Sequence, residues 1–342
     1  VDYPTQFDSA KTRKALKGSG IEVPALESYA ARVWDYWERN LDPDLFKDRS
    51  LSAAVRGKIV MITGASSGIG KATAVKVADA GATVLLVARS LDKLEETKDE
   101  IVAGGGAAHI HQCDLADIED IERMAEEVLA YHGHVDILVN NAGRSIRRSI
   151  ALSYDRYHDF ERTIQLNYLG SVRLILALLP AMRGRKHGHI INISSIGTQT
   201  NPPRFSAYVA SKAALDAFSR VIASEVVDDN VHITTIHMPL VRTPMIAPTR
   251  MYDMFPAITP EEAAEMIAKA MIRRPKKVAT RLGTFGELMY AVAPKASDSI
   301  LNTAYKLFPD SQAAKGKKEE ARDKAPSTEA VAFAHLMKGV HW

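Results

Sequence analysis

Short apolar runs rich in β-branched residues alternate with longer amphipathic stretches through the middle of the chain. The apolar runs have the length of buried strands, and most of the amphipathic stretches, about 10 to 15 residues long, have the length of helices. The predicted strands are residues 58–63, 83–87, 107–112, 135–139, 189–193, 231–236 and 277–280. The predicted helices are residues 71–80, 91–103, 118–131, 154–182, 207–227 and 260–272.

Strands that alternate with helices in this way predict right-handed βαβ units, in which helices cover both faces of a parallel sheet. We therefore expect an α/β fold with a doubly wound, Rossmann-type parallel sheet of about seven strands. The predicted dinucleotide-binding and catalytic domain spans residues 57–280. Residues 1–56 form an N-terminal helical extension or linker, with a helix over 24–40, and residues 281–342 form a C-terminal extension.

The C-terminal extension contains an amphipathic segment over residues 282–308, a charged run over 315–324 and a final apolar helix over 328–337. The charged run is typical of a solvated linker. The amphipathic segment carries an apolar stripe, which could bury in a core, cover a substrate channel or touch a membrane surface. Burial in the core is the most favoured of the three. The stripe consists of Leu282, Phe285, Leu288, Met289 and Val292.

Composition narrows the possible classes of protein. The chain has 342 residues, of which 46% are hydrophobic and 25% are charged, and its net charge is +3. These values exclude a disordered chain and argue against a nucleic-acid binder. The single cysteine, Cys113, rules out a disulfide framework and a zinc site built on several thiolates. No run of about 18 apolar residues occurs, so nothing is expected to span a bilayer.

A glycine-rich turn follows the first predicted strand and leads directly into a helix. Glycines let the backbone turn tightly and let a pyrophosphate approach the helix N-terminus, where free N–H groups and the helix dipole favour an anion. Because the turn lies between a strand and a helix, we predict that it binds a dinucleotide. Its spacing is G-x-x-x-G-x-G instead of the usual G-x-G-x-x-G. The predicted residues are Gly64, Ala65, Ser66, Ser67, Gly68, Ile69 and Gly70.

The end of the second predicted strand bears on the choice of nicotinamide cofactor. An enzyme that uses NAD has an acidic residue there, which binds the ribose hydroxyls, whereas this chain has Ala88, Arg89 and Ser90. A carboxylate would repel a 2′-phosphate, and a guanidinium can bind one through two hydrogen bonds. We therefore predict NADPH as the cofactor, with Arg89 as its anchor. The alternative is that Arg89 is an ordinary surface arginine.

Tyr208 and Lys212 lie four residues apart in a predicted helix, so their side chains share one face. An ammonium beside a phenol favours the phenolate and lowers the tyrosine pKa from its usual value of about 10. Tyr208 would then act as an acid toward a carbonyl or as a base toward an alcohol. The pair alone is a weak signal. Two further catalytic candidates are Asn167, in the long predicted helix, and Ser195, after the fifth strand.

Several short motifs taken together resemble those of the short-chain dehydrogenase/reductase family. They are TGASSGIG (63–70), CDL (113–115), NNAG (140–143), Asn167, NISS (192–195) and YVASK (208–212). They occur in the order and spacing of the family and imply an oxidoreductase that binds a nicotinamide cofactor. One departure is Leu240, which follows Pro239 where the family usually has glycine.

The resemblance implies a role for each of these residues. Tyr208 would donate the proton, and Ser195 would orient the carbonyl. Lys212 would bind the nicotinamide ribose and tune Tyr208, while Asn167 would hold a water molecule in a proton relay. The other cofactor-binding residues would be Asp114 and Leu115 at the adenine, Asn141 at the adjacent ribose, and Val241 and Thr243 at the nicotinamide amide.

A narrower resemblance extends into the flanks of the chain. Residues 35–46, 140–150, 237–249 and 327–342 look like segments of bacterial fatty acyl-CoA reductases, which occur alone or as the C-terminal half of a two-domain reductase. This resemblance implies NADPH-dependent reduction of a long-chain acyl-CoA to a fatty aldehyde, with release of CoA. Because the chain starts at Val1 without an initiator Met, a covalently linked upstream reductase domain is one expected partner.

Basic residues near the expected pocket are candidates for binding the CoA phosphates. Arg144, Arg147 and Arg148 follow the fourth strand, whose carboxyl end borders the cofactor cleft, and plain surface charge is the alternative explanation. A second candidate cluster consists of Arg273, Arg274, Lys276 and Lys277. We expect no acyl-cysteine intermediate, because Cys113 lies on the adenine side, far from the nicotinamide.

Two other functions stay open at this point. One is an NADPH-dependent reductase of free aldehydes, ketones or hydroxysteroids, since the same tetrad serves other lipophilic carbonyl substrates. The other is a dinucleotide sensor or assembly subunit without activity. We expect no metal, because the spaced histidine pairs lack carboxylate or thiolate partners. By resemblance we expect a homo-oligomer; from cysteine usage we expect the cytoplasm, with a peripheral membrane contact as one option.

Overall fold

The computed structural model describes residues 9–21, 25–40, 48–246, 255–310 and 314. The chain divides into two compact units, Val1–Asp48 and Arg49–Trp342. The first unit contains α1 (Ala10–Leu16) and α2 (Leu26–Asn40), and α2 confirms the helix predicted there. The charged run over 315–324 and the final helix over 328–337 lie outside the described residues.

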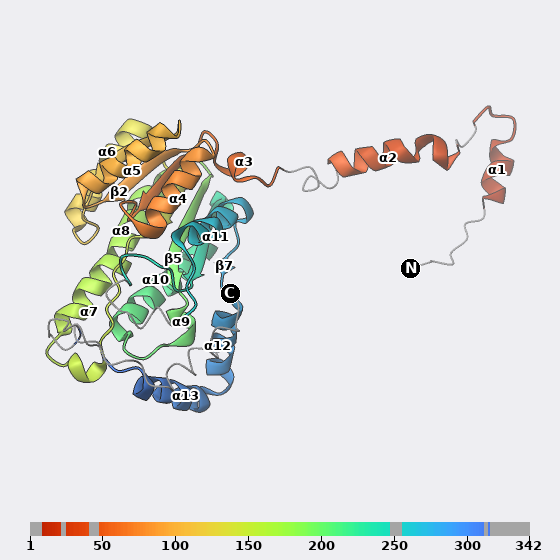
Figure 1. Ribbon diagram of the computed structural model, residues 1–342. Coiled ribbons are helices and arrows are strands. Elements are labelled where there is room, and N and C mark those ends of the chain that lie inside the picture. The colour runs from red at the N-terminus through yellow and green to blue at the C-terminus, as the bar shows by residue number, and fades with distance from the viewer. Residues whose placement is uncertain (1–8, 22–24, 41–47, 247–254, 311–313, 315–342) are drawn as a thin grey trace. The chain divides into compact units, whose positions relative to one another are not determined.

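A seven-stranded sheet forms the centre of the second unit (Figure 1). Its order is β3-β2-β1-β4-β5-β6-β7, and every neighbouring pair is parallel. The predicted doubly wound parallel sheet is confirmed. The strands are β1 (Ile59–Thr63), β2 (Thr83–Ala88), β3 (Ala107–Gln112), β4 (Ile137–Asn140), β5 (Gly188–Ser195), β6 (Val231–Met238) and β7 (Lys277–Val278).

Helices cover both faces of the sheet. One face carries α3 (Leu51–Val55), α4 (Gly68–Asp79), α5 (Leu91–Ala103) and α11 (Pro260–Arg273). The other face carries α6 (Ile118–His132), α8 (Ser171–Gly184) and α10 (Ser206–Glu225). In β1, Val60 and Ile62 belong to the first hydrophobic cluster and Met61 to the second. Because successive side chains of a strand point to opposite faces, burial of both faces explains the unbroken apolar runs.

The order of the strands creates a crevice at the carboxyl ends of the strands. From β1 the chain moves outward through β2 and β3, and it then crosses to β4 on the other side of β1. In such sheets, ligands bind outside the carboxyl ends of the strands where the order reverses. Residues at or just after the carboxyl ends of β1, β4, β5 and β6 meet there, and they include the glycine-rich turn and Ser195.

The long helix predicted over residues 154–182 is continuous but changes its winding at Asn167. α7 (Tyr157–Ile164) passes into a π-helical segment, η2 (Gln165–Gly170), and then into α8. A Cβ atom on Gly170 would lie 2.0 Å from the backbone oxygen of Leu115, so the helix meets a loop backbone to backbone. π-helical segments often occur at functional sites.

The helical stretch Tyr157–Gly184 is long and apolar enough to cross a membrane, by length and composition alone. Within it, Leu174, Ile175 and Leu178 are buried in the second hydrophobic cluster. Part of its apolar character therefore belongs to the core of the second unit.

The amphipathic segment predicted over 282–308 forms two helices, α12 (Arg281–Val292) and α13 (Pro294–Leu307). Phe285 and Leu288 are each 60% exposed and Val292 is 75% exposed, so the favoured expectation that this stripe is buried in the core is wrong. α12 meets the body of the unit through its glycines and through Glu287, which accepts a hydrogen bond from Gln199 Nε2 at 2.9 Å. Cβ atoms on Gly283 and Gly286 would lie 2.3 Å from Gln199 Oε1 and 3.0 Å from Thr200 Cγ2.

The two glycines of α12 thus pack on a short helix that directly follows β5. This helix is α9 (Gly197–Thr200). Two further short turns in the unit are η1 (Ile150–Leu152) and η3 (Val227–Asp229).

Candidate active site

The glycine-rich turn forms a cradle at the N-terminus of α4. Gly64 and Gly68 have φ angles of +69° and +54°, which glycine adopts readily. A Cβ atom on Gly70 would lie 2.2 Å from the backbone oxygen of Gly64, so a larger residue would push the turn apart. Ser67 is the N-cap residue of α4, and its side chain makes no capping hydrogen bond. The first N–H groups of α4 are therefore suited to receive a pyrophosphate.

A cavity of about 810 Å³ extends from this cradle along the carboxyl edge of the sheet. This is a common volume for a small-molecule site. Ala65 and Gly70 lie behind its wall. The predicted cofactor residues that line it are Gly64, Ser66, Ser67, Gly68, Ile69, Arg89, Asp114, Leu115, Asn141, Tyr208, Lys212, Val241 and Thr243.

Asn141, which directly follows β4, is hydrogen-bonded to the end of β1, where the glycine-rich turn begins. Its backbone N–H donates to Thr63 Oγ1 at 2.9 Å, and its Nδ2 atom donates to the backbone oxygen of Thr63 at 2.9 Å. The same Nδ2 atom would lie 2.9 Å from a Cβ atom on Gly64. Asn141 therefore holds the first turn in shape, and its contact with the ribose stays a prediction.

Arg89 stands just beyond β2, on the wall of the cavity. Its side chain is 63% exposed, and its Nη1 atom lies 3.7 Å from Oδ2 of Asp114. An exposed ion pair contributes little stability, so the guanidinium can turn toward a ligand at small cost. The position of Arg89 is thus compatible with binding of a 2′-phosphate.

The segment after β6 carries the departure from the family pattern. The side chain of Leu240 lines the cavity. Its backbone oxygen accepts from the N–H of Ile258 at 2.9 Å, and Val241 forms a parallel bridge with Ile258. Thr243 packs against the cradle, since its Cγ2 atom would lie 3.1 Å from a Cβ atom on Gly68. Leu240 is therefore an apolar residue of the cavity lining whose backbone is paired with Ile258.

Three of the four residues expected to carry the chemistry, Ser195, Tyr208 and Lys212, line the same cavity. Lys212 is 4% exposed, and its Nζ atom donates to the backbone oxygen of Ile193 at 2.8 Å. Tyr208 lies one helical turn earlier on α10 and is half-buried. It is hydrogen-bonded to Ser195, at the end of β5. A phenol, a hydroxyl and an ammonium thus line one wall, where a carbonyl oxygen can reach them.

Burial displaces the pKa values of both titratable residues. It raises the pKa of Tyr208, although the hydrogen bond with Ser195 opposes the change. It lowers the pKa of Lys212 to about 8, against the opposing influence of Asp216. The expected lowering of the Tyr208 pKa is therefore wrong, because desolvation of the phenol outweighs the influences that favour the phenolate. Tyr208 is held in its protonated form, which can donate to a carbonyl oxygen.

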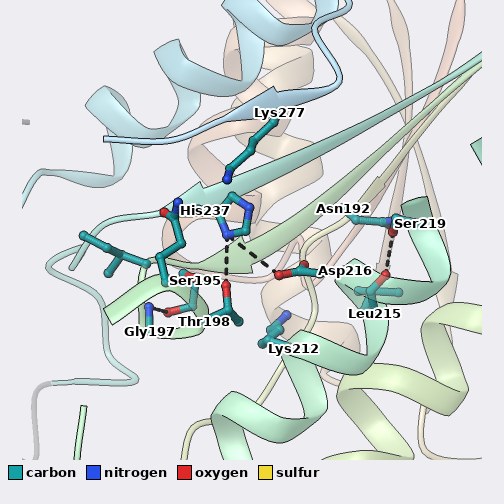
Figure 2. A network of polar contacts seen from close by, with 12 residues as sticks. Asn192, Ser195, Gly197, Thr198, Lys212, Leu215, Asp216, Ser219, His237 and Lys277 are labelled. Carbon is teal, nitrogen blue, oxygen red and sulfur yellow. Dashed lines mark hydrogen bonds and ion pairs between the residues drawn. The ribbon is translucent and has the colours of Figure 1, made fainter. Parts of the chain in front are cut away.

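The backbone around Ser195 fixes the direction of its hydroxyl. Ser195 Oγ accepts from the N–H of Gly197 at 3.0 Å (Figure 2). The backbone oxygen of Ser195 accepts from Thr198 Oγ1 at 2.9 Å. Because Gly197 occupies an acceptor position of Oγ, the hydroxyl proton is left for a partner on the cavity side.

Asn167 is fully buried and clamps the loop after β4. Its Oδ1 atom accepts from the N–H of Arg144 at 2.8 Å. Its Nδ2 atom donates to the backbone oxygen of Arg144 and to Ser211 Oγ, both at 2.9 Å. Both side-chain N–H groups are therefore occupied, and a water held by Asn167 would have to bind at an oxygen. That role stays a prediction.

The arginines expected at the CoA phosphates have other partners. Arg147 lines the cavity, but its Nη2 atom donates to the backbone oxygens of Phe308 and Pro309 at 3.1 and 3.0 Å. Arg148 donates to the backbone oxygen of Ala314 and pairs with Asp159. Arg144 contributes its backbone to Asn167. These contacts favour a structural role, in which Arg147 and Arg148 tie the C-terminal extension to the loop after β4.

No residue of the second basic cluster lines the cavity. Arg274 acts electrostatically on His189 and His232, near the amino ends of β5 and β6, which is the opposite edge of the sheet. Lys277 pairs with Glu287 at 2.5 Å. The cluster also includes Arg273 and Lys276.

Cys113 is buried, and burial raises the pKa of its thiol to about 12. A thiol with such a pKa is a poor nucleophile, in line with the expectation of no acyl-cysteine. Within the described part of the chain, no group of three or more His, Cys, Asp or Glu side chains is arranged to hold a metal ion.

The sequence offered a substrate channel as one of three positions for the apolar stripe of residues 282–292, but did not favour it, and the stripe contributes to the apolar end of the cavity. Both helices of the C-terminal extension contribute to its wall. The signal was present in the apolar periodicity of residues 282–308, but periodicity alone cannot separate a cavity lining from a core. The contributing residues include Leu282, Phe285, Met289, Ile300, Leu301 and Ala304.

Comparison with known proteins agrees with this geometry. The model of the short chain dehydrogenase family matches residues 58–252. An oxidoreductase of Mycobacterium tuberculosis is 50% identical over 316 residues, which cover 92% of each chain. A fatty acyl-CoA reductase of Acinetobacter baylyi is 53% identical over 288 residues, covering 84% of this chain and 96% of that protein.

A solved structure supports the same assignment. The crystal structure of a metagenomic short-chain oxidoreductase in complex with NADP matches with a TM-score of 0.58 and 33% identity. The match covers 66% of this chain and 98% of that one. The parallel sheet, the glycine cradle and these matches show that the chain belongs to the short-chain dehydrogenase/reductase family of oxidoreductases.

Proposed function

We propose that this oxidoreductase uses NADPH to reduce a long-chain fatty acyl-CoA to a fatty aldehyde and free CoA. The observation that carries the proposal is the continuity of one cavity. Its lining runs from the glycine cradle and Arg89, past Tyr208 and Ser195, to apolar side chains of α12 and α13. A dinucleotide and a long apolar substrate can meet there at the reacting carbon. The relative from Acinetobacter baylyi, a fatty acyl-CoA reductase, supports this choice of substrate.

The preference for NADPH rests on the residues that follow β2. No carboxylate stands at the end of β2, and Arg89 can bind a 2′-phosphate through charge-assisted hydrogen bonds. The nearby Asp114 is balanced by Arg89 in the absence of phosphate. The solved relative that contains NADP supports a nicotinamide cofactor in this cradle.

The chain's own residues act on the carbonyl oxygen of the thioester. When bound in the glycine cradle, a reduced nicotinamide would supply the hydride that adds to the carbonyl carbon. Tyr208 and Ser195 donate hydrogen bonds to the oxygen as negative charge develops there, and Tyr208 gives up its proton. The resulting hemithioacetal then loses its hydroxyl proton as its C–S bond breaks, which gives the aldehyde, and the departing CoA thiolate takes up a proton. Lys212 stabilises the negative charge that Tyr208 acquires.

The test incubates the enzyme with NADPH and palmitoyl-CoA and follows NADPH oxidation and the released thiol together. We expect both to proceed at the same rate, one thiol for each NADPH. Tyr208→Phe should abolish both while NADPH still binds, as fluorescence titration would show. Reduction of free aldehydes without any release of thiol from palmitoyl-CoA would contradict the proposal and favour the alternative of a general carbonyl reductase.

A further inference from the structure

Two apolar stripes face the cavity from α12 and α13, which together we call the roof. On α12 the lining residues are Leu282, Phe285, Gly286, Met289 and Tyr290, and on α13 they are Ser297, Ile300, Leu301 and Ala304. Both sets recur at intervals of three or four residues, so each set lies on one face of its helix. In most helices such a stripe is buried in a core, but α13 buries no residue and α12 buries only Gly283 among the described residues.

Both ends of the roof contact residues that border the cavity. At its start, Gly283 and Gly286 bring α12 against α9, which begins two residues after Ser195. At its end, the Nη2 atom of Arg147 donates to the backbone oxygen of Phe308 at 3.1 Å. The bend between α12 and α13 is therefore the part of the roof that is furthest along the chain from both anchors.

We propose that the hydrocarbon tail of the substrate runs beneath the roof from Ser195 toward this bend, and that Ser297 and Ile300 limit its length. The proposal rests on the proposed function, which places the thioester carbonyl at Ser195. Ser297 is small and faces the cavity, and Ile300 is 54% exposed. The cavity therefore reaches the first two turns of α13, and a bulky residue at position 297 would occupy part of its volume there.

The test compares Ser297→Phe with Ser299→Phe, whose side chain lies on the exposed side of α13. The values of kcat/KM are measured for octanoyl-, lauroyl- and palmitoyl-CoA. Because each buried CH₂ group is worth about fourfold in binding, the loss of two such contacts in Ser297→Phe should lower kcat/KM for palmitoyl-CoA about tenfold or more and spare octanoyl-CoA. Ser299→Phe should keep the wild-type profile. An unchanged profile in Ser297→Phe, or an equal change in both variants, would overturn the proposal.

Fatty-acid binding separates this proposal from the proposed reaction. Palmitic and octanoic acids are compared as displacers of cis-parinaric acid, a fluorescent fatty acid. We expect palmitic acid to displace the probe at lower concentration in the wild type, and Ser297→Phe to remove that difference. If this holds while no thioester is reduced, the tail site stands and the proposed reaction falls. If thioesters of all lengths react equally and no fatty acid binds, the tail site falls alone.

A second, independent observation is a buried polar network behind Lys212 (Figure 2). Asp216 follows Lys212 by one helical turn and is 4% exposed. Its Oδ1 atom has no hydrogen-bond partner within the described part of the chain, and its Oδ2 atom lies 3.7 Å from Nδ1 of His237. Leaving a buried carboxylate partly unpaired is costly, so its position requires an explanation.

The hydrogen bonds determine where His237 carries a proton. Thr198 donates its single hydroxyl proton to the backbone oxygen of Ser195, so it must accept from His237 Nδ1, 2.9 Å away. Nδ1 is therefore protonated and lies between Thr198 and Asp216. The other charged groups that face His237 are Lys277, from β7, and Glu287, from α12, and they pair with each other. Asp216 is thus the carboxylate that acts electrostatically on both His237 and Lys212.

The geometry points to Asp216 as a positioning residue, the counterion that keeps Lys212 protonated in its buried setting, while His237 and Thr198 hold the backbone of Ser195. The replacement Asp216→Asn removes the charge with little change in size. The pKa of Lys212 is about 8 while Asp216 carries its charge, and Asp216 raises that pKa. Loss of the Asp216 charge should therefore lower the pKa of Lys212 further. The alkaline limb of the pH profile of kcat/KM should then move to lower pH.

The pH profile is measured with palmitoyl-CoA, or with decanal if the thioester is not reduced. A fall of one unit in the pKa of Lys212 would reduce its protonated fraction at pH 8 about fivefold. Asp216→Glu should restore the limb, and Asp228→Asn, which removes an exposed carboxylate beyond α10, should leave it in place. An alkaline limb that does not move in Asp216→Asn, with NADPH binding retained, would overturn the assignment.

Discussion

Replacing Asn167 with alanine removes the side chain that ties the loop after β4 to the π-helical segment η2. Three hydrogen bonds are lost, at 2.8, 2.9 and 2.9 Å, and they involve both backbone groups of Arg144 and the hydroxyl of Ser211. The loop passes close to the catalytic lysine, because a Cβ atom on Gly143 would lie 3.3 Å from Nζ of Lys212. The variant should therefore lose stability and turnover together.

The structure sets the size of the loss in stability. A hydrogen bond of this kind contributes about 1 kcal/mol, so three of them contribute about 3 kcal/mol to the free energy of unfolding. A chain of 342 residues, with an unfolding entropy of about 2.1 cal/mol/K per residue, should then melt about 4 °C lower.

Differential scanning calorimetry measures this change, with Asn302→Ala as the control. Asn302 is exposed on α13, and its replacement should alter Tm by less than about 1 °C. A Tm for Asn167→Ala within about 1 °C of the wild-type value would show that these three hydrogen bonds do not stabilise the loop. The values of kcat for both variants, measured at a temperature where each is folded, show whether the loop must be held for catalysis.

Three further predictions concern the cofactor, the cysteine and pH. Arg89→Ala should raise the dissociation constant of NADPH and leave that of NADH nearly unchanged. If the ratio of the two constants is the same in the variant as in wild type, the guanidinium does not bind the 2′-phosphate. Cys113→Ala should keep its activity, because burial raises the pKa of the thiol to about 12, and complete inactivation of a folded variant would argue for covalent catalysis. Burial lowers the pKa of His189 to about 3, so only the unfolded chain binds a proton there as pH falls below about 6.5. The urea midpoint should therefore drop between pH 7 and pH 4 more steeply in wild type than in His189→Gln, and parallel curves would refute this cause.

Most of the architecture follows from local patterning. The strands and helices of the sheet lie close to their predicted bounds, because both faces of the sheet are buried and each helix has one apolar face. The glycine turn was also predictable, since its strand-turn-helix setting is written in consecutive residues. The π-helical winding at Asn167 was not, because it accompanies the approach of Gly170 to Leu115, a contact between distant segments.

The chemistry of the site was predictable in its residue types but not in its surroundings. The pKa of Tyr208 depends on how much protein covers the phenol, and no local spacing records that burial. Arg147 was a reasonable candidate for a phosphate site from its place after β4. Its actual partner, Phe308, is 161 residues further along the chain, and nothing near Arg147 in the sequence indicates that contact.

The most direct measurement uses NADPH labelled with deuterium at C4, in the position that is transferred as hydride. The enzyme is incubated with this NADPH, palmitoyl-CoA and hydroxylamine, which traps aldehydes as oximes. Mass spectrometry of the oxime identifies the product and counts its deuterium. The proposed reaction predicts the oxime of hexadecanal with one deuterium at C1, and one CoA released per NADPH consumed. No labelled hexadecanal from palmitoyl-CoA, from an enzyme that still reduces added hexadecanal to the alcohol, would contradict it.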